Sequence, residues 1–131
     1  MRINAGPSLA QLKAQLIEQV DREAEAARLR FVTPGAGQAL EYQATEAEAR
    51  AYLADPSPGG KPWPWLEAER AAQGGTPTLA AIAAEVAAQA DAWVAVGSAI
   101  KQLRRAAKLA IEGATTVAGS RAASSVTWPA P

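Results

Sequence analysis

The feature that most constrains the fold is a run from residue 77 to residue 113 in which apolar side chains recur at steps of three or four. This period predicts one long C-terminal α-helix, with Thr76 as its cap and Pro77 in its first turn. At a rise of 1.5 Å per residue such a helix is roughly 55 Å long, so it must pack on several helices or on another subunit. The repeat consists of Leu79, Ile82, Val86, Gln89, Trp93, Val96, Ile100, Leu103, Ala107 and Ala110.

Glycine and proline divide the rest of the chain into three further helical stretches, at about residues 8–31, 38–54 and 64–73. Ser8 can cap the first, and Gly74 is a natural stop for the third. The apolar residues that recur at steps of three or four in the first, and are expected to face inward, are Leu9, Leu12, Leu16, Val20 and Phe31, together with Ala24 and Ala27. In the second, the expected inward positions are Leu40, Ala44, Ala47 and Ala51.

These patterns predict an all-α bundle of three or four helices, dominated by the long C-terminal helix. Residues 1–7 form an N-terminal extension, residues 8–113 form the helical bundle, and residues 55–62 form an irregular loop between two of its helices. Residues 114–131 are small and rich in hydroxyls, and we expect them to form an extended C-terminal arm.

The composition argues against catalysis. The chain has no cysteine and no histidine, which excludes disulfides, thiolate metal sites, a cysteine nucleophile and the usual general base. Of its 131 residues 34 are alanine, so much of the hydrophobic content is small methyl groups. The spacing of the carboxylates isolates no acid/base pair. We therefore expect neither an enzyme nor a cofactor or metal site.

The 13 basic and 13 acidic residues balance, so the chain as a whole has no attraction for nucleic acid or for an anionic membrane. No run approaches the ~18 apolar residues of a spanning helix, so we expect no membrane insertion. The start of the chain lacks the apolar core of a signal peptide, which indicates synthesis in a cytoplasm.

The long apolar seam can serve an intramolecular bundle or an intermolecular coiled coil. Three other amphipathic helices are available, which favours the bundle, although self-association through uncovered surface stays open. Gln89 would set the register if it were buried in the seam, but a solvated or hydrogen-bonded glutamine is the favoured interpretation.

Four cations, Lys101, Arg104, Arg105 and Lys108, share one side of the long helix. They could grip phosphate or an acidic partner. The favoured interpretation is that they complement the helix dipole near its C-terminus. No aromatic residues alternate with them, and no nucleic-acid reading motif is present, so DNA or RNA binding is not expected.

The four tryptophans occupy distinct places in the predicted fold. Trp93 lies in the seam and is expected in the core. Trp63 and Trp65 open the third helix, where they either fix the preceding loop, which we favour, or anchor a partner. Trp128 either packs back on its own bundle or inserts into another molecule, and Val126 and Pro129 accompany it. The candidate partner-binding residues are Val126, Trp128, Pro129, Trp63, Trp65, Lys101, Arg104, Arg105 and Lys108.

The order of these features resembles the small alanine-rich proteins encoded beside tail-fibre and baseplate genes of tailed bacteriophages and prophages. The resemblance implies a tail structural or adaptor protein that binds tail-fibre or baseplate subunits in the virion and is made in the host cytoplasm. One alternative is a tail-fibre assembly chaperone absent from the mature particle, and a second is a small helical regulatory or DNA-associated protein using the four cations. The likeness covers about residues 18–115 and rests on Asp21 to Arg28, Pro34-Gly35, Gly37-Gln38, Tyr42, Glu46 to Ala49, Trp63 to Glu69, Trp93 and Ile111 to Thr115.

Overall fold

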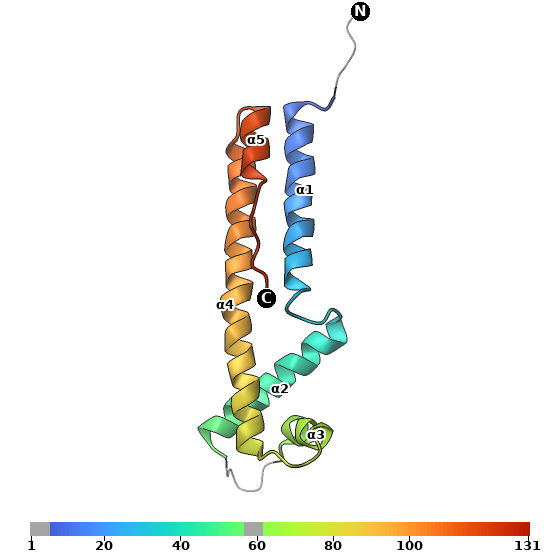
Figure 1. Cartoon of the computed structure of the whole chain (residues 1–131), viewed down its shortest axis with the longest axis vertical. Helices are drawn as coiled ribbons and strands as arrows, with labels where there is room; N and C mark the ends of the chain where they lie inside the picture. Colours follow the sequence, from blue (N-terminus) through green and yellow to red (C-terminus); the bar gives the residue numbers. More distant parts are fainter. Residues whose placement is uncertain (1–5, 57–61) are drawn as a thin grey trace, which may run out of the picture. The chain divides into compact units, whose positions relative to one another are not determined.

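A computed structural model describes residues 6–56 and 62–131, and within these ranges the regular secondary structure is entirely helical, without strands. This confirms the predicted all-α class and the dominance of a long C-terminal helix. Most of the expected N-terminal extension and of the loop at residues 55–62 lies outside the described residues. The helices are α1 (Leu9–Arg28), α2 (Ala36–Ala54), α3 (Pro64–Ala72), α4 (Leu79–Gly113) and α5 (Val117–Ala123) (Figure 1).

The chain divides into two compact units. The terminal unit comprises Met1–Val32 and Val96–Pro131, and the central unit comprises Thr33–Ala95. The first half of α4 therefore belongs to the central unit and its second half to the terminal unit. Seam residues of α4 are buried within the chain at Ile82 in one unit and at Ile100 in the other, as the bundle interpretation predicted.

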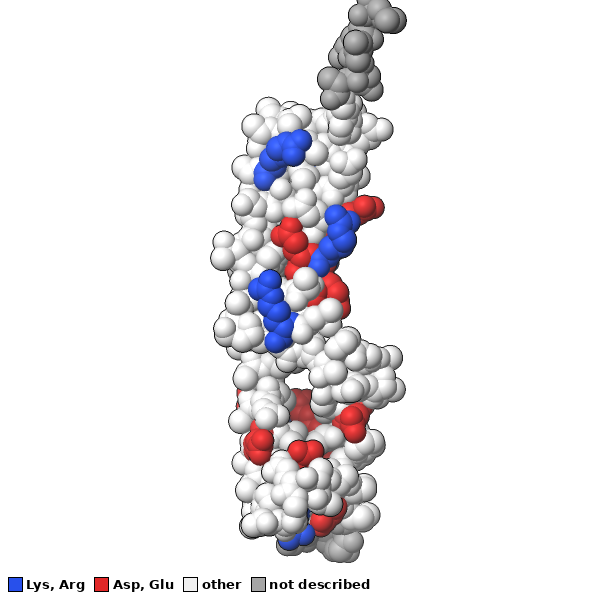
Figure 2. Space-filling model, turned by 45° about the vertical axis from the view of Figure 1, so that its right-hand side comes forward, with Lys and Arg blue, Asp and Glu red and all other residues white. Residues whose placement is uncertain are grey.

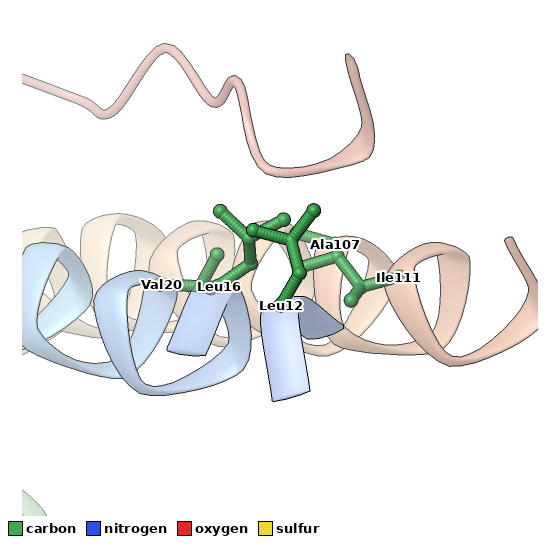
Figure 3. Close-up of a cluster of buried hydrophobic side chains, with 5 residues drawn as sticks. All are labelled: Leu12, Leu16, Val20, Ala107 and Ile111. Atoms are coloured by element: carbon green, nitrogen blue, oxygen red, sulfur yellow. The ribbon is translucent and has the colours of Figure 1, made fainter. Parts of the chain in front are cut away.

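The core of the terminal unit forms between α1 and the second half of α4. Leu12, Leu16 and Val20 project from α1 and meet Ala107 and Ile111 of α4, as Figure 3 shows. All five side chains are buried, and the three from α1 are among those that the sequence pattern placed inward.

A second buried cluster continues this core toward the C-terminal end of α1. Ala24 and Ala27 there contact Ile100 of α4. Early residues of α1 therefore meet late residues of α4, so the two helices run antiparallel. Small side chains at these positions allow a close approach of the two backbones.

Polar contacts hold the end of this helix pair at which α1 begins and α4 ends. Ser8 caps α1 as predicted, because its hydroxyl accepts from the backbone N–H of Gln11 while the Gln11 side chain accepts from the N–H of Ser8. At the same end of the pair, Lys13 Nζ of α1 donates to the carbonyl oxygens of Glu112 at 2.6 Å and Ala114 at 3.0 Å. An ammonium at these carbonyls compensates the C-terminal end of α4.

The prediction of a wholly extended arm over residues 114–131 is wrong, because it contains α5. Thr116 caps this helix by accepting from the N–H of Gly119 at 2.9 Å. The helix buries Ser120, whose hydroxyl donates to the Thr116 carbonyl oxygen. Helix α5 contacts α1. Its own apolar pattern is weak, but packing on the large side chains of the neighbouring helices is enough to stabilise it as a helix. Residues 114–116 and the segment after Ser124 are irregular.

The central unit is built around Leu66 of α3 and Ile82 of α4, both fully buried. Trp63 packs its ring against Tyr52 edge to face, with ring centroids 5.2 Å apart. The inward face predicted for α2 is wrong at two positions: Leu40 is 67% exposed and Ala47 is exposed, whereas Ala49 is buried. Alanines on several faces of α2 gave no strong amphipathic signal to choose between them.

Glycine ends α3 where the sequence predicted. Gly74 and Gly75 both have positive φ, and their N–H groups donate to the carbonyl oxygens of Ala71 and Arg70. This is the Schellman arrangement. The predicted cap of α4 is two residues too early, because the hydroxyl of Thr78, not Thr76, accepts from the N–H of Ala81.

Two expectations for α4 need correction. Trp93 is only half-buried and lies outside the three apolar clusters of the described residues. In addition, α4 is long and apolar enough, by length and composition alone, to cross a membrane, contrary to the expectation that no run approaches this. The core helix of a soluble protein meets the same criteria. Gln89 is exposed and its amide donates to Glu85, in agreement with the favoured interpretation.

Candidate functional site

The four cations of α4 separate into two pairs. Lys108 Nζ lies 3.1 Å from Oδ2 of Asp21, and Arg104 lies 3.3 Å from Oδ1 of the same carboxylate. Burial opposes the charge on Asp21, but the hydrogen bonds and charges of Lys108 and Arg104 outweigh it and hold the pKa of the carboxyl below its usual value. This pair therefore links α4 to α1.

Lys101 and Arg105 are exposed, and neither forms an ion pair within residues 6–56 and 62–131. Arg105 follows Lys101 by four residues, and Leu109, which is 55% exposed, follows Arg105 by four more. Side chains four apart on a helix are neighbours on its surface. The three residues therefore form an exposed stripe on α4 that combines two unpaired cations with a large apolar side chain.

Trp128 packs back onto the terminal unit, which is the first of the two outcomes considered for it. Its half-buried ring contacts the clusters around Val20 and Ile100, and its Nε1–H donates to Oε1 of Glu23 at 2.9 Å. Val126 is also half-buried against the first cluster, and Pro129 is half-buried. These residues hold the end of the chain against α1 and α4 and are not displayed as free anchors.

The two tryptophans at the start of α3 have different environments. Trp63 is 8% exposed and belongs to the core, so it cannot contribute to an exposed partner surface. Trp65 is 42% exposed. Its backbone N–H donates to Oε2 of Glu48 at 2.7 Å, which ties the first turn of α3 to α2. A carboxylate at this place also complements the positive end of the helix dipole.

Arg50 fixes α2 to the first half of α4. Its guanidinium lies 2.7 Å from Asp91 and 3.4 Å from Glu46. The hydrogen bond and charge of Asp91, assisted by Glu46, raise the pKa of Arg50 above its usual value. By contrast, residues 33–43, which include the start of α2, are exposed throughout.

The two units carry opposite net charge. The central unit contains eight acidic and three basic residues, a net charge of −5, whereas the remaining residues include ten basic and five acidic ones, a net charge of +5. On the face that Figure 2 shows, acidic side chains predominate over the central unit, and basic and acidic ones are mixed over the terminal unit. The net charge of the whole chain is zero and therefore does not reveal the opposite charges of the two units.

Large exposed apolar side chains occur on both units. A large side chain that remains exposed among polar neighbours is a candidate for contact with another protein. Among the described residues they are Leu29, Leu40, Tyr42, Leu53, Trp65, Val94, Leu109 and Val117.

Sequence reasoning missed two features of these surfaces. Leu109 lies just outside the predicted seam, so the sequence pattern did not mark it as a binding residue. Its position four residues after Arg105 could nevertheless have been read from the sequence. The charge asymmetry was missed because the charges were counted over the whole chain; a separate count for residues 33–95 would have found it.

Within the described residues, no group of three or more acidic side chains is placed to hold a metal ion. The arrangement presents protein-binding surfaces: a helix stripe with unpaired cations and leucine, and a short helix that displays a tryptophan. Comparison of the chain with protein-family models, curated proteins and solved structures finds no match.

Proposed function

We propose that this chain is a non-enzymatic protein that binds other protein subunits, and that it is a structural or adaptor component of a bacteriophage tail. The single observation that carries the binding role is the exposure of large apolar side chains, above all Trp65. Tryptophan is enriched among residues that dominate binding energy. The assignment to the tail, with tail-fibre or baseplate subunits as partners in the virion, rests on the sequence resemblance.

The surface around Trp65 suits this role for a physical reason. The bond from its backbone N–H to Glu48 and the buried neighbour Trp63 fix the first turn of α3, so little conformational entropy is lost there on binding. The exposed first half of α2 offers Leu40 and Tyr42 on the same unit. A partner that covers these residues would bury apolar surface now in contact with water.

A tail-fibre assembly chaperone is the second candidate, because the same exposed apolar side chains suit a transient contact with an unassembled fibre subunit. The regulatory or DNA-associated alternative has less support. Asp21 engages Arg104 and Lys108, so only two of the four cations stay without an ion pair among the described residues.

The deciding experiment is quantitative mass spectrometry of purified phage or prophage particles, normalised to the major tail protein. A fixed copy number per particle supports the structural role. Absence from particles, together with abundance in the producing cell, contradicts it and supports the chaperone.

A matched pair of variants tests the surface itself. Trp65→Ala should lower the copy number in particles, or the recovery of fibre subunits with the chain, at least tenfold. Gln15→Ala removes an exposed polar side chain from α1 and should leave both unchanged. Equal effects of the two substitutions would contradict a binding role centred on Trp65.

A further inference from the structure

The central and terminal units each expose a stripe of three residues at a spacing of four. The α3 stripe consists of Trp65, Glu69 and Gln73, and Gln73 follows the last residue of α3 directly. The α4 stripe consists of Lys101, Arg105 and Leu109, all within the helix. Consecutive members of either stripe are separated by about 6 Å along the helix axis, so the two stripes have matching length.

The chemistry of the two stripes is complementary in antiparallel order. Trp65 would face Leu109, the Glu69 carboxylate would face the Arg105 guanidinium, and the Gln73 amide would face Lys101. The Glu69 carboxylate is held in place, because it accepts from the Gln73 amide at 2.9 Å and forms no ion pair within the described residues. An apolar contact beside a charged pair is typical of the residues that dominate protein interfaces.

The net charges of the two units reinforce this match. A unit of net charge −5 on one copy attracts a unit of net charge +5 on another, and each unit repels its own counterpart. The contact between unlike units is therefore favoured over contacts between like units. Complementary charge of this kind fixes partner and orientation more than it adds affinity.

We propose that the α3 stripe of one copy docks on the α4 stripe of a second copy, so that the chain self-associates through unlike surfaces. Such a heterologous contact leaves one stripe of each kind unoccupied in a dimer, so it propagates into a ring or an open filament. This inference goes beyond the proposed function, since it names a second copy of this chain as the partner and does not depend on any tail protein.

The test is sedimentation velocity of the purified full chain over a range of concentrations, in 20 mM and 500 mM NaCl. The Debye length falls from roughly 20 Å to about 4 Å between these salt concentrations, so self-association should weaken at least tenfold in high salt. Glu69→Lys and Arg105→Glu should each raise the dissociation constant at least tenfold in low salt. The double variant Glu69→Lys with Arg105→Glu exchanges the charges and should restore association.

Two matched controls separate docking of the stripes from attraction between net charges. Glu85→Lys and Arg121→Glu make the same changes in net charge at exposed positions outside the stripes and should change the dissociation constant less than threefold. Circular dichroism confirms that each variant keeps its helical content.

A chain that stays monomeric in low salt overturns the proposal. Equal weakening by the controls and by the stripe variants also overturns it, as does a double variant weaker than both single variants. Because these measurements use the isolated chain, they can fail while the particle experiment succeeds, and the reverse also holds.

Discussion

Replacement of Trp128 by alanine should destabilise the isolated chain markedly. Alanine in place of a fully buried large aromatic costs about 3–5 kcal/mol. The ring of Trp128 is half-buried, but it joins two apolar clusters and its Nε1–H donates to the Glu23 carboxylate. A hydrogen bond to a charged acceptor contributes about 1.5–3 kcal/mol when buried and less when partly exposed. We expect a loss of about 2–3 kcal/mol in the free energy of unfolding.

The assay is urea unfolding and thermal melting, followed by circular dichroism at low protein concentration. For a unit of this size the expected loss corresponds to a fall in Tm of roughly 10 °C. Trp128→Phe, which keeps a ring but removes the donor, should cost about 1 kcal/mol, and in a Glu23→Gln background this cost should shrink. The neighbouring exposed residue gives the control, because Thr127→Ala should stay within about 0.5 kcal/mol of the parent.

An unchanged Tm for Trp128→Ala would refute the reasoning, because it would mean that the contacts of the ring with α1 and α4 contribute nothing to the folded chain. A loss equal to that of Thr127→Ala would have the same meaning.

Three further substitutions test the two units separately. Leu66→Ala should cost about 2–5 kcal/mol, because it leaves a cavity at a fully buried position of the central unit, and urea unfolding measures this. Gly74→Ala should cost about 1 kcal/mol or more in the same assay, because it places a Cβ at φ 89°, while Gly113→Ala, at a helical position with open space, should be neutral or stabilising. Asp21→Asn should destabilise by less than about 1 kcal/mol at pH 6, since the carboxylate is 43% exposed. Its lowered pKa means that the stabilisation is fully present above the usual value near 3.8 and is lost as pH falls through the lowered value. The difference between parent and variant in unfolding experiments should therefore shrink as the pH falls below 3.8.

The sequence predicted those parts of the fold that rest on large side chains. Leu12, Leu16 and Val20 formed a clear stripe on α1, and Ile82 and Ile100 did so on α4, so the faces buried in the structure were the expected ones. Ser8 and Gly74 were also found, because capping and positive φ are local properties.

The rest depended on tertiary contacts that local patterns do not encode. Leu40 was expected to be buried but is exposed, and Ala49 is buried instead. An alanine-rich helix can bury any of several faces, and the elements packed against it determine which one. Helix α5 was missed because seven residues without a large apolar stripe give too weak a signal to separate a helix from an arm. The burial of Trp63, but not of Trp65, likewise depends on another helix, because Tyr52 of α2 packs against the ring of Trp63.

The bond from Lys13 to the carbonyl oxygens of Glu112 and Ala114 joins segments about 100 positions apart, and this has a consequence for biosynthesis. The central unit is one continuous stretch and can fold once the first half of α4 has left the ribosome. Helix α1 is synthesised well before Ala107 and Ile111, which cover Leu12 and Val20. During translation α1 therefore carries an uncovered apolar face, and the rate at which the ribosome completes the chain determines how long that face is available to other molecules.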